Sequence, residues 1–443
     1  MTPRRILVLG SGGREHALAW RLGLDAGVES VVVAPGNVGM GNVAEIRAGL
    51  EVTDTRAVVA LARAERADLV VVGPEAPLVG GVADALGAAG IAVFGPDAAA
   101  ARIEGSKAFC RGIAAAAGVP MAEGAVFTAA GAAIDYAARL GPPVVIKMDG
   151  LAAGKGVTVC ATQAAAEAAI RAALEDGVHR PAGGRIVVEV ALVGPEVSLI
   201  AICDARTALA LPAARDFKRI GEGDTGPNTG GMGAIAPLPE IDPATAVALI
   251  AAFHRPVLAE LARRGAPFRG ALFAGLMLTA DGPRLLEFNA RFGDPETQAM
   301  LPLVDAPLAP LLLAAAQDRL AEVARELGVE GTVLPAHPGA SAAVVLAAPG
   351  YPERPQTGAP IAGLRELERR APTVRVFFGG VAAAPDGGLV SAGGRVLTLV
   401  GRGRDADAAA GAAHDAADLV TFPGVQRRRD IGRSLAAAGV APR

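Results

Sequence analysis

The sequence predicts an α/β protein whose N-terminal part folds as a doubly wound parallel sheet. Short runs rich in β-branched residues, at 5–9, 31–33, 69–72 and 91–94, alternate with segments of helical periodicity. Glycine or proline follows each run within two residues, as expected where strands end. Because strands that alternate with helices form parallel sheets covered on both faces, we expect residues 1–120 to form an N-terminal domain with a doubly wound parallel sheet.

The next stretch, 121–192, has the pattern of a small α+β lid. Strands are expected at 144–147, 156–160 and 185–190, with a helix at 163–175. A unit this short buries little core of its own, so we expect it to pack as a mobile lid over its neighbour.

Two further units complete the predicted organisation. Residues 193–327 contain strands, a glycine-rich segment at 221–233 and a helix near 244–264. Residues 328–443 carry short strands and a late helix, which is the pattern of a small C-terminal α+β domain.

Composition disfavours several classes of protein. Of 443 residues, 52% are hydrophobic and 20% are charged, and the net charge of −3 comes without a basic tail, which disfavours disorder and a nucleic-acid or membrane surface. The three cysteines lie far apart, as in a reducing cytosol, and the apolar run before Gly10 is too short for a signal peptide. We expect a cytoplasmic enzyme without nucleic-acid or membrane partners, monomeric or at most weakly dimeric.

Lysine is rare and clustered. All but four of the 42 basic residues are arginine, and the exceptions are Lys107, Lys147, Lys155 and Lys218. A coding bias would replace lysine wherever any solvated cation serves, so the survivors should mark sites that need a compact ammonium. Three of them lie near glycines, which favours a polyphosphate ligand. The alternative, chance survival on a solvated surface, does not explain the clustering.

A glycine loop, 10–13, connects the first strand to a helix whose N-terminus favours an anion. A Rossmann-like dinucleotide fingerprint would need glycine where Glu15 stands and an acidic residue where the second strand runs into 34–36. We therefore expect a single phosphate on a smaller ligand, with Arg14 as a clamp. A tight turn that only lets helix and strand pack closely is the alternative, and His16 is expected to pack or cap.

Two motifs in the centre of the chain suit a nucleotide. Lys147 ends a predicted strand, and Lys155 lies in a loop whose glycines let backbone amides approach an oxyanion. Gly156 stands where a P-loop would have Ser or Thr, so this is a different phosphate cradle. The strand at 187–192 leads to Glu196, whose carboxylate could accept hydrogen bonds from two ribose hydroxyls.

Glu287 and Asn289 form a candidate metal site. Their period-two spacing at a strand end puts both side chains on one side, and Mg²⁺ shared with nucleotide phosphates needs few protein oxygens. A strand end with ion pairs is the alternative. Upstream, Asp216 precedes the segment 221–233, whose glycines leave room for two small reactants under a lid, although a flexible connector would have a similar composition.

Six segments of the chain together resemble one enzyme family. They are GSGGREHA at 10–17, VGPEAPL at 72–78, EGSKAF at 104–109, IKMDGLAAGKGV at 146–157, DTGPNTGGMGA at 224–234 and EFNARFGDPETQ at 287–298. In order and spacing, the series resembles the phosphoribosylamine–glycine ligases, which are ATP-grasp enzymes of purine biosynthesis. The resemblance spans nearly the whole chain and is most specific in the long central and late motifs.

The resemblance implies a two-part ATP-grasp core, made of the lid at 121–192 and the main subdomain at 193–327. It also implies a reaction in which ATP phosphorylates the carboxylate of glycine and the amine of 5-phosphoribosylamine attacks the acyl phosphate. The products would be glycinamide ribonucleotide, ADP and phosphate, with Mg²⁺ or Mn²⁺ as cofactor. An acyl phosphate hydrolyses readily, so a lid has to exclude water.

By the same resemblance, the candidate residues take roles at a shared site. ATP would contact Lys107, Lys147, Lys155, Glu189, Val190, Leu192 and Glu196. The metal would be held by Glu287 and Asn289, and the catalytic residues would be Arg291, Asp216 and Lys155. The two substrates would contact Gly12, Gly13, Arg14, Glu75, Asp216, Asn228, Thr229, Gly230, Arg291 and Asp294.

The chain departs from the family pattern at several positions. Phe217 stands where relatives usually carry histidine, and Val190 where they carry a second glutamate. The backbone of Val190 can still serve a purine, whereas an imidazole beside the reaction centre could hold a phosphate or a proton. Phe217 therefore bears on the pose of the acceptor or on the rate. Residues 378–381 are Phe-Gly-Gly-Val where relatives usually carry His-Ala-Gly-Thr, and this difference bears on the last domain.

Two other functions are compatible with the same motifs. An ATP-grasp carboxylase or phosphotransferase would show turnover that depends on bicarbonate or needs no amine, although the chain has no biotin-carrier MKM segment. A nucleotide-binding regulatory module would bind ATP without turnover and would still bind it after Glu287→Ala.

Overall fold

The computed structural model describes residues 2–151, 156–175 and 184–433. The N-terminal sheet contains β1 (Arg5–Gly10), β2 (Ser30–Pro35), β3 (Glu45–Ile46), β4 (Leu69–Val72) and β5 (Val93–Phe94). The strand order is β3-β2-β1-β4-β5, and every pair is parallel. Because the order changes direction at β1, this is the doubly wound sheet that the sequence predicts.

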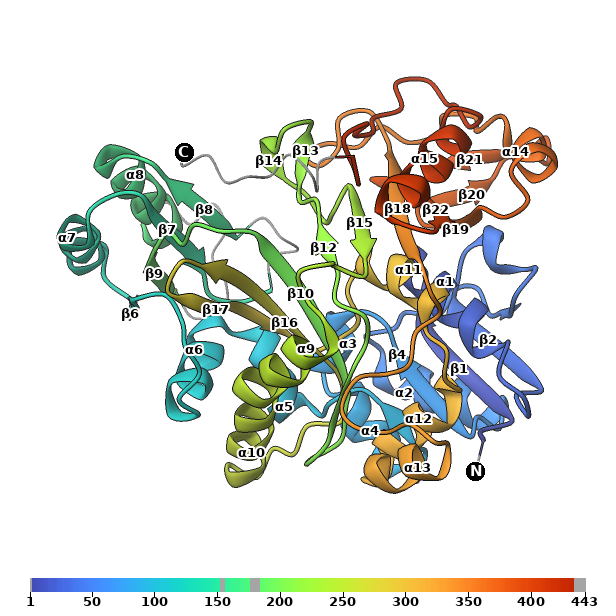
Figure 1. The fold of residues 1–443 in the computed structure, drawn as a ribbon, viewed down its shortest axis with the longest axis horizontal. Coiled ribbons are helices and arrows are strands. Elements are labelled where there is room, and N and C mark those ends of the chain that lie inside the picture. Colours follow the sequence, from blue (N-terminus) through green and yellow to red (C-terminus); the bar gives the residue numbers. More distant parts are fainter. Residues whose placement is uncertain (1, 152–155, 176–183, 434–443) are drawn as a thin grey trace.

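Helices cover both faces of this sheet (Figure 1). They include α1 (Gly13–Leu22), α2 (Thr55–Ala64), α3 (Glu75–Val79), α4 (Val82–Ala88) and α5 (Ala98–Gly105), with a 3-10 turn at Val38–Met40. Helix α6 (Lys107–Ala116) lies outside this layer and buries Cys110 and Ile113 in a core shared with residues 197–203 and 272–276. Ile6 and Val8 belong to the same buried cluster as the apolar side of α1. Leu7 and Leu9, which alternate with them along β1, belong to the cluster on the side of α2 and α4.

The lid is a four-stranded antiparallel sheet with two helices. Its strands are β6 (Gly124–Phe127), β7 (Val144–Met148), β8 (Val157–Cys160) and β9 (Ile186–Val190), in the order β6-β9-β7-β8. Helices α7 (Ala130–Leu140) and α8 (Gln163–Leu174) pack on it through small alanine side chains and Ile170. Figure 1 shows the lid standing apart from the N-terminal sheet, across the main antiparallel sheet.

That main sheet carries the predicted metal residues. It has the order β11-β10-β16-β17 and consists of β10 (Glu196–Cys203), β11 (Ala208–Ala210), β16 (Gly270–Thr279) and β17 (Gly282–Asn289). Helices α9 (Pro243–Leu249) and α10 (Arg255–Arg263) are joined by a π-helical turn at Ile250–His254 and bury Phe253, Val257 and Leu261 in the core.

One helical stretch within the described residues, Pro243–Arg263, is long and apolar enough to cross a membrane. Its mean hydropathy is 1.4, but half of it is buried inside the protein. A core helix of a soluble protein has the same character, so the feature is weak evidence for a membrane span.

A third sheet joins the glycine-rich region to the C-terminal part. Its order is β12-β15-β18-β22-β19, from β12 (Arg215–Asp216), β15 (Gly233–Ala236), β18 (Ala340–Ala347), β22 (Arg395–Gly403) and β19 (Arg375–Phe378). The sheet therefore runs across the predicted domain boundary at 327/328. Helices α14 (Leu364–Arg370) and α15 (Ala406–Ala417) and the hairpin β20 (Val381–Ala383) with β21 (Leu389–Ser391) complete the C-terminal part.

The glycine-rich segment is more ordered than a plain connector. It contains a hairpin of β13 (Arg219–Gly221) and β14 (Thr225–Asn228) before it enters β15. After β17 the chain forms α11 (Glu296–Met300), a 3-10 turn at Leu301–Leu303, α12 (Leu308–Ala316) and α13 (Leu320–Glu326). Helix α11 packs against β15 and α1, so the N-terminal, central and C-terminal parts meet there.

Candidate active site

The predicted metal residues lie at the end of β17. Glu287 is paired with Gly275 of β16, and Asn289 with Phe273, so the two side chains share one face of the sheet. Burial alone would raise the pKa of Glu287, but Lys218, Lys147, Lys107 and Arg291 together hold it below its ordinary value. An ionised carboxylate therefore stands beside an amide among four cations.

This donor set fits a hard cation that completes its coordination with phosphate oxygens. Both candidate ligands offer oxygen, the donor atom preferred by Mg²⁺. The described residues contain no group of three His, Cys, Asp or Glu residues placed to hold a metal. A metal held by Glu287 and Asn289 would therefore take its remaining oxygen ligands from nucleotide phosphates and water.

The three lysines that the structure describes converge on Glu287. Lys147 reaches over from β7, with Nζ 2.6 Å from Glu189 Oε2 and 2.8 Å from the carbonyl oxygen of Leu286. Lys107, at the start of α6, donates to the carbonyl of Gly150 at 3.1 Å. The predicted Lys155 lies outside the described residues.

Lys218 is a site residue to which the sequence analysis gave no role beyond its rarity. Its ammonium pairs with the carboxylate of Glu196, the predicted ribose contact. Burial would lower the pKa of Lys218, but Glu196, Asp216 and Glu287 raise it above its ordinary value. The ammonium of Lys218 is therefore held in its charged form. In the sequence, the only signal that marked Lys218 as a site residue was the rarity of lysine in an arginine-rich chain.

The predicted purine-contacting segment is anchored in the lid. The carboxylate of Glu189 bridges Lys147 and Arg111, whose Nη1 lies 2.9 Å from Oε1. The amide of Val190 donates to the carbonyl of Glu123 at 2.9 Å. Leu192 follows the end of β9 and is partly buried. The Glu189 side chain thus positions Lys147, and the Val190 amide is already bonded within the lid.

Arg291 joins the main sheet to the N-terminal domain. Its Nε lies 3.1 Å from Glu104 Oε1 and 3.4 Å from Glu75 Oε2. Burial would lower the pKa of Arg291, but the two carboxylates raise it. Burial raises the pKa of Glu104, which also accepts the amide of Ala290 at 2.7 Å. The predicted residues Arg291 and Glu75 are therefore in contact.

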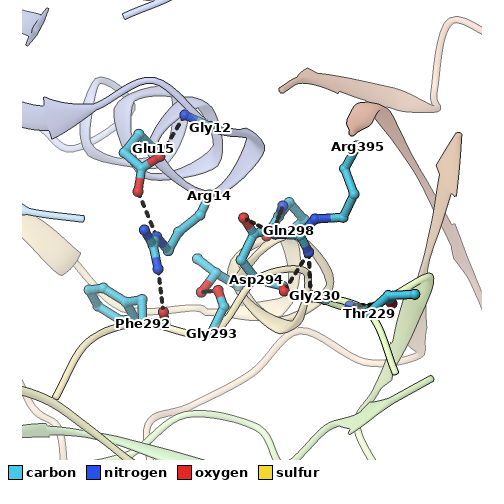
Figure 2. Close-up of polar contacts among 12 residues, drawn as sticks. Gly12, Arg14, Glu15, Thr229, Gly230, Phe292, Gly293, Asp294, Gln298 and Arg395 are labelled. Carbon is cyan, nitrogen blue, oxygen red and sulfur yellow. Dashed lines mark hydrogen bonds and ion pairs between the residues drawn. The ribbon is translucent and has the colours of Figure 1, made fainter. Parts of the chain in front are cut away.

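Asp294 is held by Arg395, a residue of β22 that the sequence analysis missed (Figure 2). Nη2 of Arg395 donates to Asp294 Oδ2 at 2.8 Å, and Nη1 donates to the carbonyls of Asp294 and Gly230. Gln298 donates to the other carboxylate oxygen at 2.7 Å. Tyr351 accepts the amide of Gly230 at 2.9 Å. Arg395 and Tyr351 come from distant segments, and no motif in the sequence marks them, whereas Gln298 lies in the same motif as Asp294.

Asp216 is half-buried close to this group. Burial, followed by the charge of Glu296, raises its pKa well above the ordinary value. Its Oδ1 is buried without a hydrogen-bond partner in the described part of the chain. Gly231 has a φ of +108°, and a Cβ there would lie only 2.6 Å from that oxygen. The glycine therefore gives the carboxyl group room, and the oxygen stays without a partner among the described residues.

The remaining predicted residues of the glycine-rich segment differ in position. Thr229 is built into the fold, because its Oγ1 donates to the carbonyl of Lys218 at 2.8 Å and accepts the amide of Gly231 at 2.9 Å. Asn228 lines a cavity of about 330 Å³ between the hairpin and the lid. Lid residues Val157 and Thr158 lie across it.

The first glycine loop, 10–13, is filled by the side chain of Glu15. The amide of Gly12 donates to Glu15 Oε2 at 2.7 Å, and Arg14 Nε donates to Oε1 at 2.6 Å (Figure 2). Gly13 lies against Gln298, where a Cβ would come within 3.0 Å of its Nε2. His16 packs as expected, with its Nδ1 accepting the amide of Phe378 at 3.0 Å.

Three family models match successive parts of the chain. They describe the N domain of phosphoribosylglycinamide synthetase at 4–104, its ATP-grasp (A) domain at 105–297 and its C domain at 341–434.

Curated relatives match the chain over nearly its full length. A phosphoribosylamine–glycine ligase of Mycobacterium leprae is 47% identical over 440 residues, covering 98% of both chains. One of Agrobacterium fabrum is 45% identical over 428 residues, covering 97% of this chain and 98% of the relative.

Solved structures agree with this assignment. The crystal structure of phosphoribosylamine–glycine ligase from Thermotoga maritima has a TM-score of 0.81 at 31% identity, covering 96% of this chain and all of that one. The biotin carboxylase domain of a Hydrogenobacter thermophilus carboxylase has a TM-score of 0.70 at 15% identity, covering 96% and 92%, a likeness of fold alone. The chain therefore belongs to the phosphoribosylglycinamide synthetase family, the ATP-grasp enzymes also called phosphoribosylamine–glycine ligases.

Proposed function

We propose that this chain uses ATP to ligate glycine to 5-phosphoribosylamine, giving glycinamide ribonucleotide, ADP and phosphate. The observation that carries the proposal is the convergence of Lys107, Lys147, Lys218 and Arg291 on Glu287, beside Asn289. Cations around an anionic metal ligand suit the transfer of a γ-phosphoryl group, which needs charge neutralisation and positioning.

The nucleotide would lie between the lid and the main sheet. Lys107, Lys147 and Lys155 would contact its phosphates, and the backbone of 189–192 would face the purine. Glu196 would bind the ribose while keeping its contact with Lys218. Glu287 and Asn289 would hold Mg²⁺, or Mn²⁺ as the alternative, which neutralises phosphate charge when bound.

The reaction would proceed through glycyl phosphate. A carboxylate oxygen of glycine attacks the γ-phosphorus, and the bond to the β-γ bridging oxygen breaks, which releases ADP. The amine of phosphoribosylamine then attacks the acyl carbon, phosphate leaves with the former glycine oxygen, and the nitrogen loses a proton. Arg291 would stabilise the transferring group, and closure of the lid would keep water from the acyl phosphate.

The two substrates would meet between the N-terminal domain and α11. Glycine would lie near Asp216, Asn228, Thr229 and Gly230, where the unpartnered oxygen of Asp216 can accept a hydrogen bond from an ammonium group. Phosphoribosylamine would contact Gly12, Gly13, Arg14, Glu75 and Asp294. We further propose that the enzyme works in the cytoplasm on these small molecules alone, as a monomer, with a weak dimer as the alternative.

The carboxylase alternative has weaker support. Biotin carboxylase domains share the fold at 15–18% identity, which carries no activity with it. The ligase relatives share 44–47% identity across the chain.

The test is ADP formation by purified protein with Mg²⁺-ATP, glycine and freshly generated phosphoribosylamine, with each reactant omitted in turn. The proposal predicts ADP only in the complete mixture, in a one-to-one ratio with glycinamide ribonucleotide. ADP that forms without the amine, or that requires bicarbonate, would contradict it.

A further inference from the structure

The glycines of the first loop enclose a side chain of the protein itself. A Cβ on Gly10 would lie 2.6 Å from Glu15 Cγ, and one on Gly12 would lie 2.9 Å from Oε2. A Cβ on Gly73, at the end of the neighbouring strand β4, would overlap Oε1. Glu15 itself is only 2% exposed. The space left by three glycines is therefore filled by one carboxylate.

The Glu15 carboxylate occupies the anion position of helix α1. Its Oε2 accepts the amide of Gly12 at 2.7 Å, and its Oε1 accepts Nε of Arg14 at 2.6 Å. Hydrogen bonds that involve an ionised group are stronger and shorter than neutral ones. An incoming phosphate therefore finds the amide of Gly12 already used.

Arg14 is fixed at two of its three nitrogen atoms. Nε is held by Glu15, and Nη1 donates to the carbonyl of Phe292 at 3.1 Å. The residue is 7% exposed, and its charge acts on the carboxyl groups of Glu75 and Asp294. The remaining nitrogen, Nη2, makes no hydrogen bond with the described residues, so the held guanidinium presents one donor edge.

We propose that Glu15 is a positioning residue for the acceptor phosphate. It orients Arg14 so that Nη2 meets the phosphate of phosphoribosylamine, and it fills the space that a dinucleotide pyrophosphate would take at this loop. The inference rests on the proposed function and adds to it a residue that acts through Arg14. A phosphate at this site is then bound by the guanidinium edge instead of the Gly12 amide.

The first test is Glu15→Gln, which keeps the size of the side chain and an oxygen acceptor for the Gly12 amide. It removes the charge that holds Arg14. Calorimetric titration with ribose 5-phosphate should give a dissociation constant raised about tenfold or more, with unchanged affinity for a nonhydrolysable ATP analogue. Unchanged affinity for ribose 5-phosphate would overturn the proposal.

An independent variant reaches the same carboxylate from another strand. Gly73 does not have a positive φ, so Gly73→Ala fits the backbone, but its methyl group should push Glu15 away from Arg14. We expect the same loss of ribose 5-phosphate affinity. Gly87→Ala is the matched control, since a Cβ at Gly87, in α4, meets no atom within 4 Å. Equal behaviour of the two alanine variants would contradict the proposal.

The route through Arg14 is tested by combining variants. After Arg14→Met, Glu15→Gln should cause no further loss, because its effect passes through the guanidinium. Two independent losses would contradict that route. ADP formation by the unmodified protein distinguishes failure of the positioning role from failure of the proposed function. If the unmodified protein turns over and Glu15→Gln is unaffected, only the positioning role is overturned. If the unmodified protein shows no turnover, the proposed function is overturned as well.

Discussion

Arg395 makes two hydrogen bonds to Asp294, from Nη2 to the carboxylate at 2.8 Å and from Nη1 to the main-chain carbonyl at 2.7 Å. One residue comes from β22 in the C-terminal part, and the other lies just before α11. The same guanidinium also donates to the carbonyl of Gly230. A single cation thus fixes the glycine-rich segment against a predicted substrate contact.

Replacing this cation should harm both folding and activity. In Arg395→Met, the Asp294 carboxylate loses its main partner, and the free energy of unfolding should fall by about 3 kcal/mol. Urea denaturation measures this loss. Arg395→Lys should retain more stability, but it should raise the KM for phosphoribosylamine because an ammonium cannot hold both oxygens in a fork. A methionine variant with unchanged KM would show that Asp294 does not contact the substrate.

Glu287→Gln should strongly reduce turnover while ATP still binds. The variant keeps the shape of the side chain but removes the negative charge expected to bind the metal, so kcat should fall at least about a hundredfold. Without metal, affinity for an ATP analogue should stay the same or rise, because one carboxylate no longer repels the phosphates. Asp281→Asn, at an exposed turn next to β17, is the matched control. Normal turnover in Glu287→Gln would remove this residue from the metal site.

Lys147→Arg tests the argument from rare lysines. The ammonium sits in a buried position between Glu189 and the Leu286 carbonyl, where a larger planar guanidinium does not fit. We expect kcat/KM for ATP to fall by about tenfold or more. For Lys155→Arg the sequence predicts the same fall in kcat/KM for ATP. Arg171→Lys on the exposed surface of α8 should be neutral, and equal activity in all three variants would refute the argument.

His16 should make the protein less stable in acid. Burial lowers its pKa to about 4, against 6.5 for the exposed group. The unfolded chain therefore binds the proton more readily, so this contribution to stability is complete above pH 6.5 and falls as the pH drops toward 4. The loss is about 2 kcal/mol at pH 5. His16→Gln should show a correspondingly smaller difference between urea unfolding at pH 7 and pH 5, whereas an identical difference would be evidence against a neutral buried imidazole.

The sequence predicts the sheet cores and the metal residues because their signals are local. Strands such as 69–72 are apolar runs closed by glycine, and Glu287 and Asn289 are two positions apart on one strand. The hairpin β13–β14 was not predicted, since glycine-rich stretches carry no periodicity.

Long-range partners had no local signal. Arg395 lies 101 residues from Asp294 and 165 from Gly230. Glu15 was visible in the sequence only as a break in a dinucleotide fingerprint. Its enclosure by Gly73 depends on β1 and β4, two strands that meet only in the folded sheet.

The most direct test of the whole account follows one oxygen atom. With glycine labelled by ¹⁸O in both carboxylate positions, the account predicts that each phosphate released during ligation carries one ¹⁸O, and that glycinamide ribonucleotide keeps the other. Mass spectrometry measures the ¹⁸O content of the released phosphate. Phosphate without the label would show that no glycyl phosphate forms and would contradict the proposed mechanism.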